Sequence, residues 1–256
     1  MNIALNGYLG HMGKEVVALC RTGYRGSVLT LGVDPRCERN VVDGIALYKS
    51  FAEINEEIKI DCIVDFSHHS CVTELLSYAV KNGIPTVIAT TGHTDGELSA
   101  IYEASKSIPV FFSANMSLGV ALLVELAKTA ALAMPEAEIE IIEKHHNRKI
   151  DAPSGTALMI ANAIADVRPE AYNKLGRSGH GSRDVNEIGI HAIRMGNIVG
   201  EHEVIIGTQN QTITLKHEAH SRALFAEGAL AAASFLVGRG PGLYDMKSLV
   251  SGESLI

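Results

Sequence analysis

The stretch Ile3-Ala4-Leu5-Asn6-Gly7-Tyr8-Leu9-Gly10-His11-Met12-Gly13 decides how this chain folds. A short apolar run, typical of a buried strand, leads into a turn with glycine at every third position, and residues 11–20 have the apolar spacing of a helix. Gly7 permits a tight turn, Gly10 lets the backbone approach a ligand, and Gly13 lets the helix pack closely on the strand. Backbone N–H groups at such a helix start can hold phosphate, so the stretch predicts a dinucleotide-binding α/β fold.

The alternation of strand and helix continues through the first half of the chain. Helices are expected at 71–82 and 96–107, between strands expected at 28–33, 62–65, 86–89 and 110–112. Strands joined by helices in this way pair in parallel through right-handed crossovers. The fold class is therefore predicted to be α/β, with a Rossmann-type parallel sheet in the cofactor domain.

The pattern changes after residue 115. Long apolar helices are expected at 118–134, 155–166 and 221–237, whereas residues 173–186 are polar, glycine-rich and basic and are expected to form a mobile loop. Further strands are expected at 138–144, 188–193, 201–206 and 212–216. Because no helix-sized segment separates the last three, this second domain is predicted to be α+β with a mixed or antiparallel sheet.

The composition limits the class of protein. The chain of 256 residues carries a formal net charge of −7, and this acidic balance argues against nucleic acid as its main partner. No apolar run is long enough to span a bilayer, and no basic segment precedes the first strand as it would in a signal peptide. The four cysteines lack paired or zinc-like spacing and are expected to be reduced thiols. We therefore expect a cytoplasmic protein with neither membrane nor nucleic acid as a partner.

Asp34 stands at the end of the second predicted strand, where an acid accepts hydrogen bonds from the ribose hydroxyls of a dinucleotide. An acid there favours NADH, because it would repel the 2′-phosphate of NADPH. Arg36, two residues on, could hold that phosphate instead. The sequence predicts NADH or NADPH as cofactor, with NADH favoured.

Other candidate cofactor contacts lie where further strands are predicted to end. Ligands bind at the carboxyl edge of a parallel sheet, so the residues that follow the strands should face the dinucleotide. Phe66 could pack on it, and Thr91 and Gly92 could offer backbone groups to its nicotinamide end. Ser67 and Thr90 lie beside them and belong to the same candidate site.

A second signal is His145-His146-Asn147-Arg148-Lys149-Ile150-Asp151-Ala152-Pro153-Ser154-Gly155-Thr156, which gathers imidazoles and fixed cations in an acidic chain. Lys149 is a compact cation that can bind a carboxylate. Ser154 can cap a helix whose first N–H groups, at Gly155 and Thr156, can bind another carboxylate with help from the helix dipole. The pattern predicts a site for a small dicarboxylate.

The paired histidines allow other interpretations. Histidine has an ordinary pKa of roughly 6.5, so one imidazole can give up a proton near neutral pH. No metal site is predicted, because adjacent histidines point in different directions and no cysteine or carboxylate is spaced to complete one. A merely solvated basic loop is the remaining alternative.

Residues 143–157 resemble the signature of the 4-hydroxy-tetrahydrodipicolinate reductase family, whose members reduce a cyclic imine-type dicarboxylate in lysine and diaminopimelate biosynthesis. The resemblance extends along the chain. Residues 7–13 resemble the glycine turn of that family, 112–120 its interdomain hinge, 194–202 one of its strand turns and 221–226 the start of its last helix.

The resemblance implies roles for the matching residues. His145 would donate a proton to the substrate, and Lys149 would hold a substrate carboxylate and assist the proton transfer. His146, Gly155 and Thr156 would also bind substrate. The cofactor would be met by a further group: Gly7, His11, Met12, Asp34, Gly92, Ala114, Asn115 and Met116.

The resemblance also implies a domain organisation. A dinucleotide-binding domain would be made from residues 1–114 and 221–256, and residues 115–220 would form a substrate-binding and oligomerisation domain. Closure of the domains and a homotetramer built by the central sheets are implied as well. Two alternatives stay open: another small-substrate NAD(P)-dependent dehydrogenase of similar architecture, and a non-enzymatic NADH-binding redox sensor, for which no DNA-reading basic element is evident.

Overall fold

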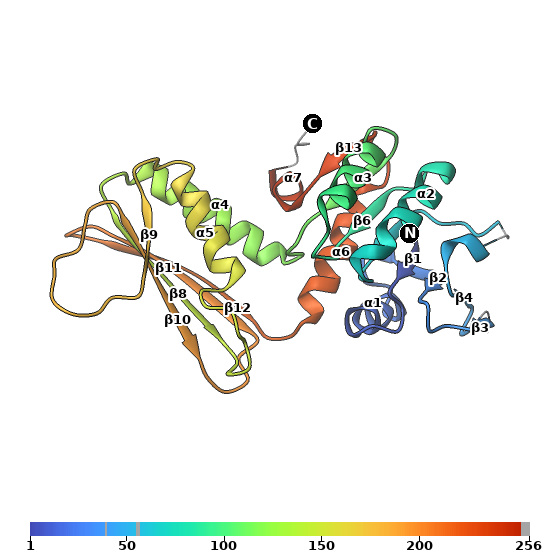
Figure 1. The fold of residues 1–256 in the computed structure, drawn as a ribbon, viewed down its shortest axis with the longest axis horizontal. Coiled ribbons are helices and arrows are strands. Elements are labelled where there is room, and N and C mark those ends of the chain that lie inside the picture. The colour runs from blue at the N-terminus through green and yellow to red at the C-terminus, as the bar shows by residue number, and fades with distance from the viewer. Residues whose placement is uncertain (39, 55–56, 252–256) are drawn as a thin grey trace. The chain divides into compact units, whose positions relative to one another are not determined.

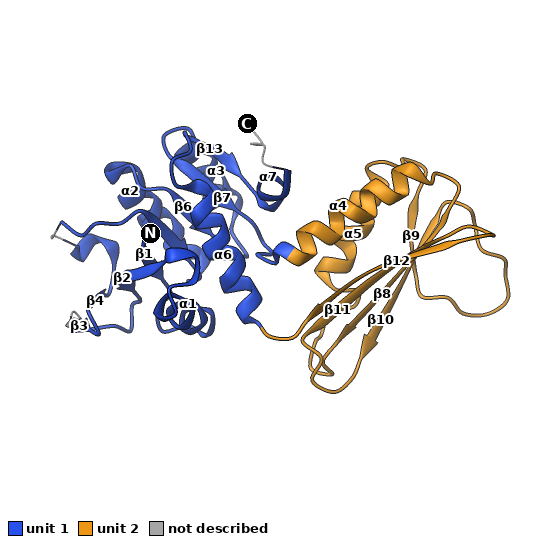
Figure 2. Ribbon diagram, turned by 180° about the vertical axis from the view of Figure 1, so that it is seen from behind, with its two compact units in different colours: residues 1–118, 222–256 blue, residues 119–221 orange. Residues whose placement is uncertain are grey.

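The computed structural model describes residues 1–38, 40–54 and 57–251, and the chain divides into two compact units. Unit 1 consists of Met1–Leu118 and Arg222–Ile256, and unit 2 consists of Gly119–Ser221 (Figure 2). Unit 1 is therefore built from both ends of the chain, whereas unit 2 is continuous in sequence.

The sheet of unit 1 has the order β13-β7-β6-β5-β1-β2-β4-β3 (Figure 1). All its neighbouring strands pair in parallel except β3 with β4. The strands are β1 Asn2–Asn6, β2 Val28–Val33, β3 Asn40–Val42, β4 Ile45–Tyr48, β5 Cys62–Asp65, β6 Thr86–Ile88, β7 Pro109–Phe112 and β13 Gly242–Tyr244. This arrangement confirms the predicted Rossmann-type parallel sheet.

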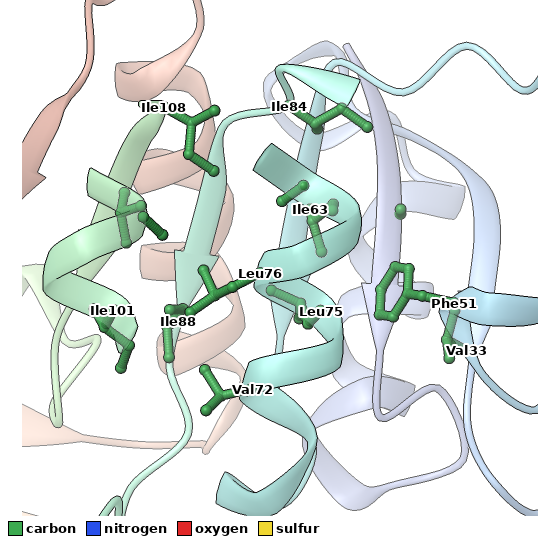
Figure 3. Packing of buried hydrophobic residues seen from close by; sticks show 14 of the residues in the cluster. Val33, Phe51, Ile63, Val72, Leu75, Leu76, Ile84, Ile88, Ile101 and Ile108 are labelled. Atoms are coloured by element: carbon green, nitrogen blue, oxygen red, sulfur yellow. The ribbon is translucent and has the colours of Figure 1, made fainter. Parts of the chain in front are cut away.

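Helices cover both faces of this sheet. One face carries α2 and α3, and α1 and α6 pack together on the other (Figure 3). The helices of unit 1 are α1 His11–Arg21, α2 Val72–Asn82, α3 Asp95–Ser105, α6 Ala223–Leu236 and α7 Met246–Ser251, with short 3-10 turns at η1 Tyr24–Gly26, η2 Phe51–Glu53 and η3 His69–Cys71. Because both faces are covered, the central strands are continuous apolar runs, and Ile63, Leu75 and Ile88 are fully buried between the layers.

The sheet of unit 2 has the order β12-β11-β8-β10-β9. The strands are β8 Glu138–His145, β9 Tyr172–Leu175, β10 Glu187–Arg194, β11 Gly200–Gly207 and β12 Thr212–Ala219. β10 pairs in parallel with both β8 and β9, whereas β11 pairs antiparallel with both β8 and β12. The predicted mixed sheet is therefore confirmed. Helices α4 Leu118–Ala133 and α5 Gly155–Ala165 cover one face and bury alternate residues of β8, including Ile139 and Ile141.

Several elements differ from the sequence-based expectations. The predicted loop at 173–186 was wrong for its first residues, because β9 runs through Leu175 and pairs with β10. Every side chain of β9 is exposed, so this edge strand has no apolar period to read. The edge strands β3 and β13, the short strand β4 beside β3, and the helix α7 were not predicted either, because each is too short to show a clear period.

No helix in the described ranges combines the length and the hydrophobicity needed to cross a membrane. The four cysteines, all within those ranges, form no disulfide. Cys20, Cys37 and Cys62 are buried, and burial raises the pKa of the Cys20 thiol to about 11.

Candidate active site

The glycine turn of unit 1 brings backbone so close to backbone that side chains have no room. Gly7 has φ +86°, and a Cβ there would lie 2.6 Å from the carbonyl oxygen of Phe66. A Cβ at Gly13 would overlap the carbonyl oxygen of Gly7 and lie 2.7 Å from that of Tyr8. Since no described side chain caps α1, the N–H groups that follow Gly10 form its open start. This cradle fits the phosphates of a dinucleotide.

Two of the predicted cofactor residues, Asp34 and Arg36, are bound to each other. Arg36 Nε and Nη2 donate to the Asp34 carboxylate over 2.8 and 2.9 Å, and the backbone N–H groups of Leu9 and Arg36 donate to it over 3.1 Å. The hydrogen bonds from the Arg36 side chain are the main reason that the pKa of Asp34 lies below its usual value. A ribose hydroxyl that binds Asp34 would have to displace the Arg36 guanidinium, which is 65% exposed.

A buried carboxylate, Asp65, organises the neighbouring strand ends. Its oxygens accept hydrogen bonds from Thr90 Oγ1 over 2.8 Å, from Ser67 Oγ over 2.6 Å and from Asn6 Nδ2 over 2.9 Å. Burial raises the pKa of Asp65. The hydroxyls of Ser67 and Thr90 are therefore engaged with Asp65, and the nearby Gly92, with φ +84°, shapes the turn that follows β6. Asp65 was assigned no role from the sequence, although an acid at the end of a predicted apolar strand was a usable signal; only the structure shows that it lies beside Asn6.

The predicted hinge residues Ala114, Asn115 and Met116 follow β7. The backbone N–H of Ser117 donates to Asn115 Oδ1 over 2.9 Å. Met116 is 2% exposed, and a Cβ on Gly228 of α6 would overlap its carbonyl oxygen. Close packing on α6 therefore holds this segment in unit 1.

In unit 2, the histidine stretch connects the end of β8 to the start of α5. Its backbone is tied to the turn after β10: Met195 N–H donates to the His145 carbonyl over 3.0 Å, and His146 N–H donates to that of Ile198 over 2.8 Å. Ser154 is the N-cap of α5, and its Oγ accepts a hydrogen bond from Ala157 N–H over 3.2 Å. The predicted helix start at Gly155 is confirmed.

The cations of this stretch have partners. Lys149 Nζ lies 2.8 Å from Asp151 Oδ1, with the lysine side chain 22% exposed. Arg148 Nη2 donates to Asn197 Oδ1 over 2.6 Å. A substrate carboxylate that binds Lys149 would compete with the half-exposed Asp151. Arg148, through Asn197, joins this loop to the turn between β10 and β11. Within the described residues, no group of three or more His, Cys, Asp or Glu side chains is placed to hold a metal ion.

Glu143, Arg194 and His202 complete this site, and sequence reasoning gave them no role. Glu143 is fully buried, and one of its oxygens lies 2.6 Å from Nδ1 of His145. Arg194 pairs with the same carboxylate over 2.7 Å. His202 Nε2 lies 3.1 Å from Ser154 Oγ, and its ring packs edge-on to that of His145 with 5.2 Å between centroids. The available signal was a glutamate at an inward position of β8.

His202 should make the stability of unit 2 depend on pH. Burial, together with the positive charge of His145, His217 and Lys149, lowers the pKa of His202 from 6.5 to about 4. The unfolded chain therefore binds more protons in this window, so the free energy of unfolding should fall by up to about 3 kcal/mol as the pH drops from 6.5 to 4. Urea unfolding at several pH values should show a smaller loss in His202→Gln than in the wild type. Equal slopes for the two proteins would contradict a neutral buried His202.

The two halves of the chain match the two parts of one family. Residues 1–116 match the family described as "Dihydrodipicolinate reductase, N-terminus", and residues 119–250 match "Dihydrodipicolinate reductase, C-terminus". The 4-hydroxy-tetrahydrodipicolinate reductase of Caldanaerobacter subterraneus subsp. tengcongensis is 46% identical over 254 residues, which cover 98% of each chain. The enzyme of that name from Clostridium novyi is 43% identical over 256 residues, or 98% of this chain and 99% of the relative.

Solved structures share the fold. The dipicolinate-bound dihydrodipicolinate reductase from Paenisporosarcina sp. TG-14 superposes with a TM-score of 0.82 at 24% identity and covers 96% of this chain and 97% of its own. A scyllo-inositol dehydrogenase from Lactobacillus casei, solved with NAD(H) and scyllo-inositol, gives a TM-score of 0.56 at 11% identity and covers 100% of this chain and 90% of its own.

Proposed function

The chain belongs to the dihydrodipicolinate reductase family, and we propose that it reduces 4-hydroxy-tetrahydrodipicolinate to tetrahydrodipicolinate. It is accordingly an NAD(P)-dependent oxidoreductase of lysine and diaminopimelate biosynthesis. The observation that carries this conclusion is the match of both halves of the chain, with 46% identity to a reductase of that name over 98% of each sequence.

We propose that the glycine turn of unit 1 holds the dinucleotide. The N–H groups at the start of α1, at His11 and Met12, would bind its phosphates beside Gly7, Gly10 and Gly13. The bound cofactor supplies a hydride to the substrate. The strand-end residues Phe66, Ser67, Thr90, Thr91 and Gly92 and the segment Ala114, Asn115 and Met116 would line the rest of its site.

Substrate would bind at the start of α5 in unit 2. Gly155 and Thr156 occupy the first turn of that helix, where backbone N–H groups and the helix dipole favour a carboxylate. The Lys149 ammonium would leave Asp151 and bind a second carboxylate of the substrate, and His146 would contact the same substrate. A dianion is the ligand that matches these neighbouring positive groups.

His145 would supply the proton. Its ring is almost buried, and Nδ1 is held by Glu143, so Nε2 is the atom available for transfer. Negative charge that develops on the substrate as hydride arrives would be stabilised by protonated His145 and by Lys149. The reaction balances as follows: the 4-hydroxyl leaves the substrate as water, which creates a conjugated C=C–C=N system, and one hydride from the cofactor and one proton are added across that system to give tetrahydrodipicolinate.

The Asp34–Arg36 pair supports the use of both NADH and NADPH. Asp34 would favour the ribose hydroxyls of NADH, and the exposed Arg36 would be free to hold a 2′-phosphate after it leaves Asp34. We propose a preference for NADH, because the buried Asp34 carboxylate stays in place with either cofactor.

The remaining properties rest on the family and on the exposed face of unit 2. The face of the sheet opposite α4 and α5 carries Ile193, which is 38% exposed, together with charged residues, and it supports the proposal of a homotetramer joined through these sheets. A cytoplasmic location and closure of the two units on the ligands are proposed with it.

The test is oxidation of NADH and of NADPH, in parallel, with freshly made condensation product of pyruvate and aspartate semialdehyde. Lys149→Ala should lower kcat/KM by about 10–100-fold, the effect of losing a charge-assisted hydrogen bond. Pyridine-2,6-dicarboxylate should raise the melting temperature of the wild type by mass action. Oxidation of neither cofactor by protein that still binds NADH would point to another dehydrogenase or to a sensor.

A further inference from the structure

Glu143 is a fully buried carboxylate at the centre of the site in unit 2. Its Oε1 accepts hydrogen bonds from Arg194 Nη2 over 2.7 Å and from the backbone N–H of Ser154 over 2.9 Å. Its Oε2 accepts one from Arg194 Nη1 over 2.8 Å and lies 2.6 Å from His145 Nδ1. Although burial alone would raise it, these donors hold the pKa of Glu143 below its ordinary value. Glu143 is therefore an anion and can only accept hydrogen bonds.

An anionic partner determines where His145 carries its proton. A neutral imidazole has one N–H and one lone pair, and Nδ1 must be the N–H because it faces a carboxylate oxygen. The lone pair, or the second proton of the charged ring, is then at Nε2. Space exists beside that atom because Gly200 has no side chain: a Cβ there would lie 3.1 Å from Nε2.

The same carboxylate ties the histidine to the start of α5. Oε1 holds Ser154, the N-cap residue of α5, while Oε2 holds His145. The Nη1 and Nη2 groups of Arg194 donate to Glu143 and to the carbonyl oxygens of Asp151 and Ile193. Arg194 is thus the counterion of Glu143, and its hydrogen bond to the Asp151 carbonyl oxygen holds the loop that carries Lys149.

We propose that Glu143 is a positioning residue that keeps His145 in the Nδ1–H form, so that Nε2 exchanges the proton with substrate, and that it sets the distance from this atom to the start of α5. The inference rests on the proposed function, since it assigns how the proton of that reaction is delivered. A purely structural ion pair would leave the protonation site of His145 undetermined, and this difference can be measured.

The first experiment uses the free wild-type enzyme labelled with ¹⁵N-histidine. Long-range ¹H–¹⁵N correlation spectra distinguish a protonated ring nitrogen from one with a lone pair, and the signals of His145 are assigned by their loss in His145→Gln. We expect Nδ1 to be protonated and Nε2 to carry the lone pair when the ring is neutral. The reverse tautomer would overturn the proposal, whether or not the enzyme is active.

The second experiment is Glu143→Gln. Arg194 donates to both carboxylate oxygens and Ser154 N–H donates only to Oε1, so the amide nitrogen should take the place of Oε2, where His145 Nδ1 can accept its hydrogen bond and the ring proton moves to Nε2. We expect the altered tautomer and a fall in kcat of about 10–100-fold with an unchanged Kd for NADH. An unchanged tautomer and kcat in folded Glu143→Gln would overturn the proposal.

Glu140→Gln is the matched control. Glu140 is on the same strand, and it also pairs with a histidine, His191, over 2.8 Å and with Arg177 and Arg183, but it faces the opposite side of the sheet. The Glu140→Gln substitution should leave the ¹⁵N signals of His145 as they are in the wild type. Failure of the proposed function would look different: the wild type would show the Nδ1–H form but would oxidise neither cofactor with the condensation product.

Discussion

Replacing His145 with glutamine is expected to lower kcat by about 10²–10⁴-fold while leaving the Kd for NADH unchanged. Glutamine can occupy the place of the ring beside Glu143, but it has no group that gives up a proton near neutral pH. The cofactor is expected to bind in unit 1, whereas His145 lies at the end of β8 in unit 2, so cofactor binding should not depend on this side chain. Steady-state rates and NADH fluorescence titration measure the two quantities separately.

His180→Gln is the control for this substitution. His180 is exposed in the segment between β9 and β10, and its replacement should leave kcat as in the wild type. Because His145 is almost buried, the melting temperature of each variant should be measured first, so that only folded protein is compared. Turnover of folded His145→Gln within a few-fold of the wild type would remove His145 from the role of proton donor.

Gly13→Ala is expected to lower the free energy of unfolding by ~3 kcal/mol and to weaken NADH binding strongly. The added Cβ would overlap the carbonyl oxygen of Gly7 and lie 2.7 Å from that of Tyr8, and backbone cannot turn aside as a flexible side chain can. Relief requires α1 to move away from β1, which displaces the N–H groups expected to hold the phosphates. Urea unfolding and NADH titration would report the two effects.

Gly96→Ala is the matched substitution in another helix of the same unit. A Cβ on Gly96, near the start of α3, would meet no atom within 4 Å, so stability should be unchanged or slightly higher. The comparison removes the general effect of replacing glycine by alanine in a helix. If Gly13→Ala were as stable as Gly96→Ala and bound NADH normally, the close approach of α1 to the turn would not be a requirement of the fold.

Much of unit 1 could be predicted because its pattern is local. The predicted strands at 28–33 and 62–65 match β2 and β5, since both are mostly apolar segments of a sheet that is covered on both faces. The edge strand β9 could not be predicted, because its pairing with β10 depends on backbone hydrogen bonds and its side chains face solvent. The resemblance stated from residues 143–157 is confirmed at the level of the family.

The candidate site was predictable only in part, for a related reason. Residue types and spacing point to His145, Lys149 and the start of α5, because each has a local signature. Glu143 and Arg194 are 51 positions apart, and nothing in the spacing shows that they meet. Asp34 and Arg36 were both predicted to contact the cofactor, but nothing in the sequence indicated that their side chains bind each other.

The origin of unit 1 from both ends of the chain determines the order in which the protein can be assembled during synthesis. Helix α6 packs on α1, and α1 leaves the ribosome some two hundred residues before α6 does. All of Gly119–Ser221 is available before α6 exists, so unit 2 has the sequence it needs while the layer that α1 and α6 form in unit 1 still lacks α6. Unit 1 is begun first and finished last, and until α6 emerges the apolar surface that α6 covers has no partner from its own chain.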